Sequence, residues 1–325
     1  MRNSLSLTFV AVLCLTSTVP LGAQRFSFER ALDGTEQMTL DITTERGQID
    51  VSAGEVGKVM VRGTVTVRVG LNVPLDAVAI AKRVAANPPV QRENTTLRLR
   101  PPVSDDERRA VTIAYDVIVP KGTRVITRTD SGATSIRDVS EPVSVSTQSA
   151  AIDLRDLGSS VEIRTGSGGV RASSVGGDVN VSTESSSITL RNLKAGLRAR
   201  TQSGAVTVTF AGKGDVDVET GSSAIDLSDV NGGLSATSNS GSIRISGLPT
   251  SPWRASTGSS RIDLGIRRDA TFTLDARSDS SDVELDGFAV DGTTKKGVAA
   301  GHVRGGGPMV RAASRSGRIR VGLRP

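Results

Sequence analysis

The chain has 325 residues, a formal net charge of +6, 35 glycines and only 2% aromatic residues. Small and β-branched residues with few aromatics favour thin, stacked strands over a conventional globular core. A single cysteine, Cys14, and a single histidine, His302, exclude a disulfide framework and a Cys/His metal site. The sequence therefore predicts a large, regular structure that is stabilised by packing and backbone pairing and that binds no metal or cofactor.

Residues 1–23 have the pattern of an export signal. Arg2 precedes the apolar stretch SLTFVAVLCLTSTV, and PLGA before Gln24 provides the small residues of a cleavage site. The apolar stretch is too short for a comfortable membrane span, and no later segment is apolar for long enough. We therefore expect an exported protein, in the periplasm or at the cell surface, with no transmembrane segment once the signal is removed.

Lysine and arginine alternate with aspartate and glutamate along most of the chain. Such alternation is typical of solvated strand faces, while the basic balance leaves an anionic partner, a cell-surface polysaccharide or a nucleic acid, as a second interpretation. Platforms for single-stranded nucleic acids interleave aromatic residues with basic ones, a pattern that this chain lacks. We expect no nucleic-acid partner.

A unit of about 18 residues repeats from residue 129 onward, which indicates stacked coils. Copies begin with TDSGATSI at 129, TQSAAIDL at 147 and TGSGGVRA at 165, and seven more begin at 183, 201, 220, 238, 257, 278 and 314. Apolar residues alternate on both sides of each T-x-S, as at Val143 and Val145 and again at Ile152 and Leu154. Each unit therefore predicts two short strands with one buried face. Because no unit can bury its apolar face alone, the units must stack as a β-solenoid.

The T-x-S-G segment is predicted to form the corner between the two strands of a unit. Thr147 and Ser149 share the parity of Val143, so we expect their hydroxyls to point inward and to bond those of the next coil. In the first copy this places Ser131 on a hydroxyl ladder and Gly132 at a corner that needs a positive φ. TDSGA is then a scaffold corner and not the site of a serine nucleophile.

Residues 24–120 are less regular and are interpreted as the first coils of the solenoid with a cap. LDITTERGQIDV at 40–51 matches the repeated unit. One short helix is predicted at about 74–87, where it would close an open end of the stack. Residues 121–325 form the solenoid proper, in which 287–308 breaks the pattern, either as a degenerate coil or as a projecting loop.

The order of these segments resembles a known bacterial family. The segment TIAYDVIVPKGTRVITRTDSGATSIRDV, followed by T-x-S-G-x-[IV]-x-[IVL] units, is similar to the domain of unknown function 4097 family, whose members are often labelled putative adhesins. The resemblance covers most of the chain after the signal, and its most specific part is the junction at 119–132. It implies an exported or envelope-associated β-solenoid without established catalytic residues, and it leaves a role in envelope-stress sensing open.

Two classes of enzyme can be compared with the sequence. Serine chemistry needs a base, and His302 lies far along the chain from Ser131. Polysaccharide lyases and hydrolases on parallel β-helices are the more serious rival, and their chemistry needs clustered carboxylates. Asp153, Asp226 and Asp263 recur in outward positions, but not in consecutive units. We therefore expect no enzyme activity and no catalytic residues, with a carbohydrate-active enzyme as the alternative.

Two features are weak candidates for binding a ligand. Trp253, the sole tryptophan, occupies the first apolar position of its unit, which indicates a core plug in a widened coil or, alternatively, a carbohydrate contact. The C-terminal run RAASRSGRIRVGLRP carries Arg311, Arg315, Arg318, Arg320 and Arg324 and no acid. It is interpreted either as a solvated last coil whose charges prevent end-to-end stacking or as a docking site for an anionic envelope surface.

Together these patterns predict an all-β fold, a single-chain, parallel β-helix-like solenoid. The predicted function is that of an exported, non-enzymatic, adhesin-like or scaffolding protein that binds an envelope polymer or protein. Its candidate binding residues are Arg311, Arg315, Arg318, Arg320 and Trp253.

Overall fold

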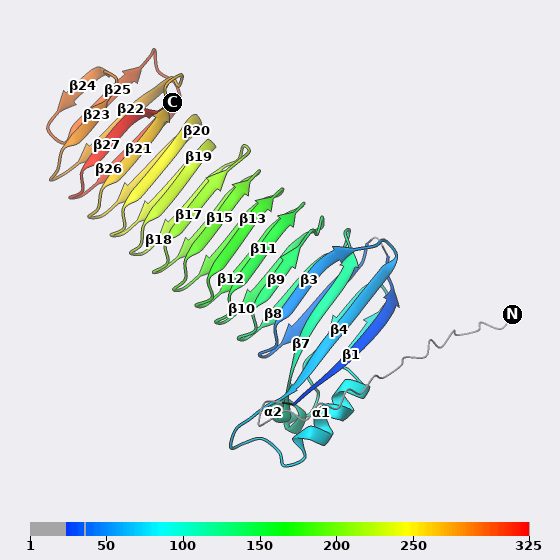
Figure 1. Cartoon of the computed structure of the whole chain (residues 1–325). Helices are drawn as coiled ribbons and strands as arrows, with labels where there is room; N and C mark the ends of the chain where they lie inside the picture. The colour runs from blue at the N-terminus through cyan, green and yellow to red at the C-terminus, as the bar shows by residue number, and fades with distance from the viewer. Residues whose placement is uncertain (1–23, 36, 325) are drawn as a thin grey trace. The chain divides into compact units, whose positions relative to one another are not determined.

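A computed structural model describes residues 24–35 and 37–324, and these residues are mostly in β-strands (Figure 1). They fall into two compact units that are divided after Gly132. The sequence places this boundary at residue 120. The division lies later because β8 (Arg124–Thr129) pairs in parallel with β2 (Thr39–Thr44) of the first unit. The expected export signal and Cys14 lie outside the described residues.

The strands of the first unit pair in two groups. In one group, β4 (Lys58–Val67) lies antiparallel between β1 (Arg25–Asp33) and β7 (Val111–Pro120), and β3 (Ile49–Gly54) pairs with β7 in parallel. In the other, β2 lies in parallel between β6 (Thr96–Leu99) and β8, and β5 (Val90–Glu93) pairs antiparallel with β6. The segment 40–51 therefore contributes β2 to one group and β3 to the other, as a coil of a solenoid does.

Two helices interrupt the strands of the first unit. Helix α1 (Ala77–Ala86) lies where the sequence predicts one, buries Ile80 and Val84, and packs against β1, β4 and α2. Helix α2 (Asp105–Ala110) is not anticipated from the sequence, although Ser104 and Glu107 form a capping box at its start. The described residues contain these two helices, and neither is long and apolar enough to cross a membrane.

The second unit is a stack of two-strand coils, which confirms the predicted β-solenoid (Figure 1). First strands pair in parallel from coil to coil: β10 (Val143–Thr147), β12 (Val161–Thr165), β14 (Val179–Thr183), β16 (Leu197–Thr201) and β18 (Val216–Thr220). Second strands do the same: β9 (Thr134–Arg137), β11 (Ile152–Leu157), β13 (Val170–Val175), β15 (Ile188–Leu193) and β17 (Val206–Phe210). In β19 (Ile225–Ser238) and β20 (Ile243–Thr257), a second strand continues directly into the next first strand.

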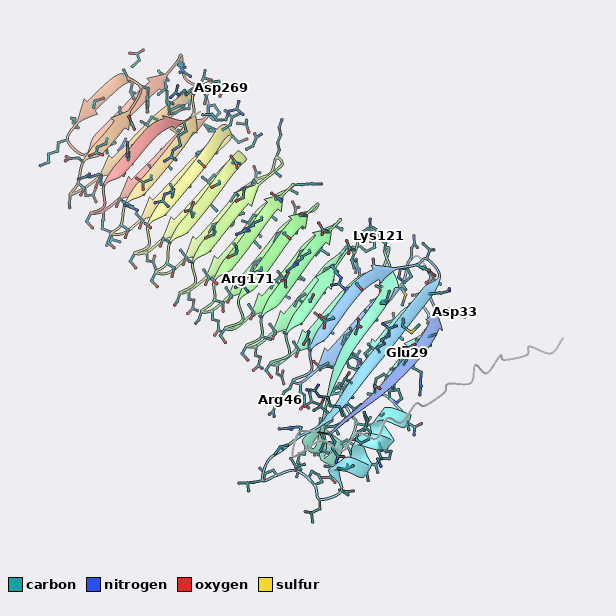
Figure 2. All side chains as sticks on the ribbon, in the orientation of Figure 1. Glu29, Asp33, Arg46, Lys121, Arg171 and Asp269 are labelled. Carbon is teal, nitrogen blue, oxygen red and sulfur yellow. The ribbon has the colours of Figure 1, made fainter. Side chains whose placement is uncertain are left out.

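Burial in each coil follows the alternation in its sequence. In β12, Val161 and Ile163 are buried while Arg164 is exposed, and Arg171 on β13 projects outward (Figure 2). The apolar side chains of successive coils meet in parallel register, as Val161 does with Val179. Burying one such side chain stabilises the fold by about 1.5–3 kcal/mol, so the core is assembled from many similar contributions.

Left-handed backbone recurs at one position within the second strands. There Asp156, Ser174, Asn192 and Asp229 have φ values of 54°, 57°, 56° and 63°. Aspartate and asparagine enter this region more readily than most other residues with a side chain, which accounts for their recurrence here. The T-x-S-G corner has no such need, so the predicted positive φ of Gly132 is wrong.

Glycine is needed at the corner for space and not for its φ. A Cβ at Gly168 would lie 1.7 Å from the carbonyl oxygen of Ala150 in the preceding coil, and Gly204 approaches Ser186 in the same way at 1.6 Å. Along the stack of the second unit, this position alternates between a residue with a side chain and glycine: Ala150, Gly168, Ser186, Gly204, Ser223, Gly241, Ser260, Gly317 and Ser281. The corner therefore repeats every two coils, at twice the period of the sequence unit.

A buried hydroxyl ends the first strand of each coil. The Oγ1 atom of Thr165, a residue that is 6% exposed, accepts a hydrogen bond of 3.0 Å from the backbone N–H of Gly168. The hydroxyl also bonds the coil below, as where Thr257 Oγ1 donates to the carbonyl oxygen of Gly241 at 2.9 Å. The hydroxyl ladder of the second unit therefore consists mainly of bonds between side chain and backbone, which satisfy buried N–H and C=O groups.

The serine two residues after this hydroxyl points outward in two of the coils. Ser131 and Ser149 are exposed, so their predicted inward position is wrong. The chain bends directly after the threonine, which ends the period-two alternation on which the prediction was based. In the first unit Thr129 takes the role expected of Ser131, because its Oγ1 accepts from the N–H of Gly132 at 2.9 Å and from Thr44 Oγ1 at 3.0 Å.

The last coil in the sequence is not the last coil in the stack. β26 (Met309–Ser314) lies in parallel between β20 and β22 (Phe272–Ser278), and β27 (Ile319–Arg324) lies between β21 (Ile262–Arg267) and β23 (Val283–Asp286). The segment 287–308 contains the antiparallel strands β24 (Asp291–Lys295) and β25 (Val298–Val303), and β25 also pairs with β22. The interpretation of the arginine-rich C-terminus as the end of the stack is therefore wrong, because neighbouring coils cover both of its edges.

Replacing Gly168 by alanine should lower the free energy of unfolding by about 3 kcal/mol, because the new Cβ overlaps a backbone oxygen that cannot move alone. Gly169→Ala is the matched control, since a Cβ at Gly169 meets nothing within 4 Å. Urea unfolding of both variants measures the difference. Equal stability of the two variants would contradict the proposed close approach at the corner.

Replacing Thr201 by valine should cost about 2 kcal/mol, because the N–H of Gly204 loses its 2.9 Å bond to Thr201 Oγ1 while buried. Thr207→Val, at an exposed position of β17 in the same coil, should change stability by less than about 0.5 kcal/mol. Thermal and urea unfolding test the pair. If the Thr201→Val variant were as stable as the Thr207→Val variant, the hydroxyl ladder would not stabilise the fold.

Candidate functional site

A shallow groove of about 840 Å³ follows the corner of the second unit across six neighbouring coils. Buried threonines, Thr201 among them, line it from below. The exposed residues just before these threonines, such as Arg164 and Arg200, flank it on one side, and those just after, such as Gln202 and Asn239, flank it on the other. We call this feature the corner groove.

The corner groove is polar and electrically balanced. Its charged lining residues are Arg164, Arg200, Glu184 and Glu219, two of each sign. Arg200 Nε lies 3.4 Å from Glu219 Oε2, so that one acid and one base already neutralise each other. Arg164 Nη2 likewise lies 2.5 Å from Glu162 Oε1, so both guanidinium groups have a partner, while their other N–H groups and the amide and hydroxyl groups of the lining can still form hydrogen bonds.

The groove offers hydrogen bonding but little that acid–base or nucleophilic chemistry needs. Among the described residues that line it there is no histidine, and its carboxylates are Glu184 and Glu219. His302 lies elsewhere, on β25, where its Nδ1 is 3.2 Å from Thr273 Oγ1. Within the described part of the chain, no group of three or more His, Cys, Asp or Glu side chains could hold a metal ion.

Three aspartates have carboxyl groups whose pKa is lower than usual. Hydrogen bonds from arginine lower the pKa of Asp41, Asp153 and Asp269. A general acid in a glycosidase needs the opposite, a carboxyl whose pKa is raised. These three aspartates therefore act as partners of arginine on outward faces.

Asp41 on β2 shows how such a pair is built in the first unit. Its carboxylate accepts hydrogen bonds from Arg100 Nη2 at 2.6 Å and from Arg128 Nη1 at 3.0 Å, and its side chain is only 15% exposed. The hydrogen bond from Arg100 is the largest cause of the lowered pKa of Asp41, and partial burial opposes it. The carboxylate thus bridges strands that are distant in sequence.

Trp253 lies in the core of the second unit. It is 2% exposed and stands in register between Leu234 and Val310 of the neighbouring coils. Its Nε1 donates a hydrogen bond of 2.9 Å to the carbonyl oxygen of Gly232, so that the polar atom of the ring is satisfied. The ring therefore presents no face to a ligand in solution.

The four candidate arginines lie on different faces of one coil. Arg311, on the first strand, is 3.2 Å from Asp275, and Arg318 is 3.3 Å from Glu284 beside the second strand. Arg320 on β27 pairs with Asp286 at 2.6 Å. Arg315 is exposed at the corner between the strands. Because three of the four have acidic partners, they do not form one continuous basic surface.

The residues of the corner groove were missed as a site by the sequence interpretation. Part of its signal was present, since most positions on either side of the buried threonines are polar, as at Gln202, although Gly166 and Gly221 are not. What the sequence does not reveal is that these positions border a hollow. That depends on the bend after the threonine, which moves the following residue out of the strand.

The fold and the corner groove define a β-solenoid with a polar, extended surface site. The chain belongs to the Toastrack family DUF4097, which matches residues 93–322 and confirms the resemblance stated from the sequence. No curated protein matches the chain in the sequence comparison.

The comparison with solved structures found bacterial proteins that match most of this chain. A putative adhesin from Parabacteroides distasonis is 8% identical with a TM-score of 0.33, over 93% of this chain and 97% of that one. A putative cell adhesion protein from Clostridium sporogenes is 11% identical with a TM-score of 0.23, over 93% and 100% of the two chains. At these scores the two proteins carry no argument about what this chain binds.

Replacing Asp41 by asparagine should lower the free energy of unfolding by about 1 kcal/mol at about pH 7, because two charge-assisted bonds weaken at a partly exposed site. The pKa of Asp41 in the folded state lies below its unfolded value of about 3.9. The advantage of the natural residue is therefore complete above that value and disappears as the pH falls through the folded-state pKa.

Urea unfolding of both proteins as a function of pH measures this effect. Asp156→Asn is the control, since the equivalent position of another coil, Asn192, carries asparagine with a similar φ. A stability difference for Asp41→Asn that stays constant into strong acid would contradict the assignment to its charge.

Proposed function

We propose that this protein is an exported, non-enzymatic binding protein of the cell envelope, adhesin-like in role, that holds an extended neutral polysaccharide in the corner groove. The observation that carries the proposal is the groove itself, a polar hollow that crosses six coils without interruption. A polymer that lies along it can contact every coil, whereas a compact ligand would use only a fraction of its length. Repeated weak contacts along one chain add up to useful affinity.

The chemistry of the lining favours a neutral polymer with many hydroxyl groups. The two arginines and two glutamates of the groove balance, so that neither a strongly acidic nor a strongly basic chain gains from it. The amide of Gln202 and the guanidinium of Arg164 can each bond sugar hydroxyls as donors, and the amide oxygen can accept. Binding by hydrogen bonds without aromatic stacking suits moderate affinity at each unit and avidity over the whole length.

A carbohydrate-active enzyme finds less support in the same groove. Glycoside hydrolysis uses two carboxyl groups with separate roles, about 5–10 Å apart. Of the two carboxylates that line the groove, Glu219 is already paired with Arg200. A sensing component of the envelope would also need a ligand-binding surface, and a neighbouring gene for a regulator would favour that role.

A glycan array of neutral and acidic bacterial polysaccharides, probed with residues 24–325, tests the proposal. We expect binding to neutral polymers, and Gln202→Trp should weaken it at least about tenfold because the indole fills the groove. Thr207→Trp is the matched control, since it places the same side chain at an exposed position of the second strand in the same coil.

Two results would contradict the proposal. One is the absence of binding to any polysaccharide on the array and to isolated envelope material. The other is equal binding by the Gln202 and Thr207 variants, which would place the ligand away from the groove. Hydrolysis of a bound polymer by the unmodified protein would instead establish the enzymatic alternative.

A further inference from the structure

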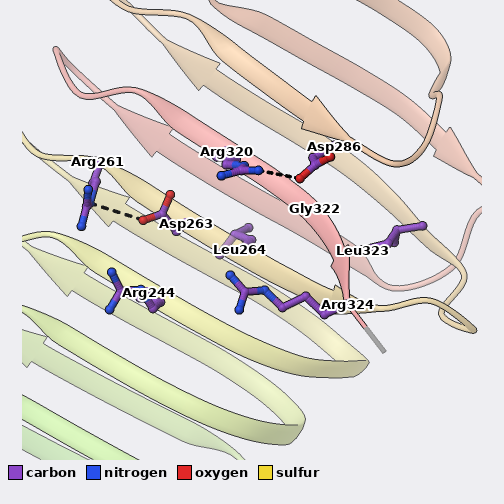
Figure 3. A pocket seen from close by; sticks show the side chains of 9 residues that line it. All are labelled: Arg244, Arg261, Asp263, Leu264, Asp286, Arg320, Gly322, Leu323 and Arg324. Atoms are coloured by element: carbon purple, nitrogen blue, oxygen red, sulfur yellow. Dashed lines mark hydrogen bonds and ion pairs between the residues drawn. The ribbon is translucent and has the colours of Figure 1, made fainter.

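A second hollow, of about 430 Å³, lies among the last coils of the second unit (Figure 3). Four arginines line it, Arg244, Arg261, Arg320 and Arg324, together with the two aspartates Asp263 and Asp286. Hollows of this size are typical of sites for small molecules or for one unit of a polymer. We call it the arginine pocket.

Both aspartates of the arginine pocket already have a partner. Asp263 Oδ2 lies 3.3 Å from Arg261 Nε, and Asp286 Oδ2 accepts a hydrogen bond of 2.6 Å from Arg320 Nη2 (Figure 3). Arg324 differs, because its guanidinium forms no hydrogen bond or ion pair with the described residues. The pocket therefore has a positive charge that its own carboxylates do not neutralise.

Gly265 makes room for Arg324. Gly265 on β21 stands opposite Gly322 on β27, while the preceding coil carries Ser246 at the same position. A Cβ at Gly265 would lie 2.5 Å from Arg324 Nε and 2.6 Å from its Cδ. The side chain of Arg324 therefore lies close over bare backbone, and it runs toward Arg244 in Figure 3.

We propose that the arginine pocket binds the anionic group of an acidic sugar unit, either a uronate carboxylate or a sugar phosphate. Guanidinium groups bind both by paired, charge-assisted hydrogen bonds. Arg324 supplies a charge with no partner among the described residues, and Arg244, whose Nη1 bonds Asp226 Oδ2 at 3.1 Å, has further N–H groups toward which Arg324 extends. Gly322, which stands opposite Gly265 and lines the pocket, adds no side chain to its floor.

The arginine pocket is separate from the corner groove. It lies on the second strands, near Leu264 and Gly322, while the groove follows the ends of the first strands from Ser146 to Asn239. The groove is balanced in charge, whereas the pocket carries four arginines against two aspartates. The proposal for the pocket therefore does not depend on the proposed function of the groove.

Calorimetric titration of residues 24–325 with glucuronate, glucose 6-phosphate and glucose, all at one ionic strength, tests the pocket. We expect the acidic sugars to bind and glucose not to bind. Arg324→Gln should weaken binding about tenfold, because it removes a charge-assisted contact. Gly265→Ala should weaken it about as much although it keeps every charge, because the new Cβ displaces the guanidinium of Arg324.

Arg318→Gln is the matched control, since it removes one charge just before β27, at a residue that pairs with Glu284 outside the pocket. Its affinity for the acidic sugars should change by less than about twofold. Circular dichroism and thermal unfolding show whether each variant is folded, and Arg324→Gln, an exposed change near the end of the chain, keeps the test valid if Gly265→Ala is unstable.

Each outcome of the titration bears on the proposal. Tighter binding of glucuronate assigns a carboxylate ligand, and tighter binding of glucose 6-phosphate assigns a phosphate; both support the pocket. Equal binding of glucose, equal weakening in all three variants, or no binding of either acidic sugar would overturn it. Gln202→Trp should leave the affinities for the acidic sugars unchanged. A result that contradicts the proposed ligand of the pocket can therefore be distinguished from one that contradicts the proposed ligand of the groove.

Discussion

The structure depends on one interaction, the bond between a buried hydroxyl and the backbone at the end of each first strand. At this corner the chain must turn within a coil that is only about 4.8 Å thick. The turn leaves a buried N–H three residues after the threonine, and the hydroxyl of Thr165 or its equivalent satisfies it. Since an unsatisfied buried N–H costs about 1–3 kcal/mol, a threonine or serine recurs at this position in every coil of the second unit. The close approach of successive corners then requires glycine in alternate coils.

Because the corner and core take the inward positions, the outward positions are free to carry binding chemistry. The corner groove arises where exposed residues flank the buried hydroxyls, and the arginine pocket arises where two outward positions are reduced to glycine. Both candidate sites are therefore modifications of one scaffold. The first uses the repeat, with equivalent positions on every coil, and the second uses a departure from it. A long neutral polymer and a single anionic unit are the ligands that fit these two geometries.

The period and the alternation of apolar residues were enough to predict the solenoid, its coil length and the role of Thr147, since each follows from local geometry. The inward position of Ser149 was wrong because parity holds only within a strand, and the chain bends after the threonine. The order of the last coils was wrong because a repeat in sequence states nothing about which coils are neighbours. For the candidate sites, the polar columns were visible in the sequence, whereas the arginine pocket depends on Gly265 and Arg324, which are distant in sequence.

On the second strands, the position of the C-terminal coil inside the stack lets the outward charges alternate, whereas on the first strands it places Arg311 opposite Arg254. On the outward face of the second strands, the residues in register are Asp226, Arg244, Asp263, Arg320 and Glu284, which alternate in sign. If β23 lay directly on β21 and β27 outside it, Asp263 would face Glu284, and like charges opposite each other destabilise a sheet. With β27 between them, Arg320 has an acid on either side. Arg320 therefore complements the acids of the neighbouring second strands, and Arg324, which lies beyond these pairs and has no partner among the described residues, is the arginine of β27 left for a ligand.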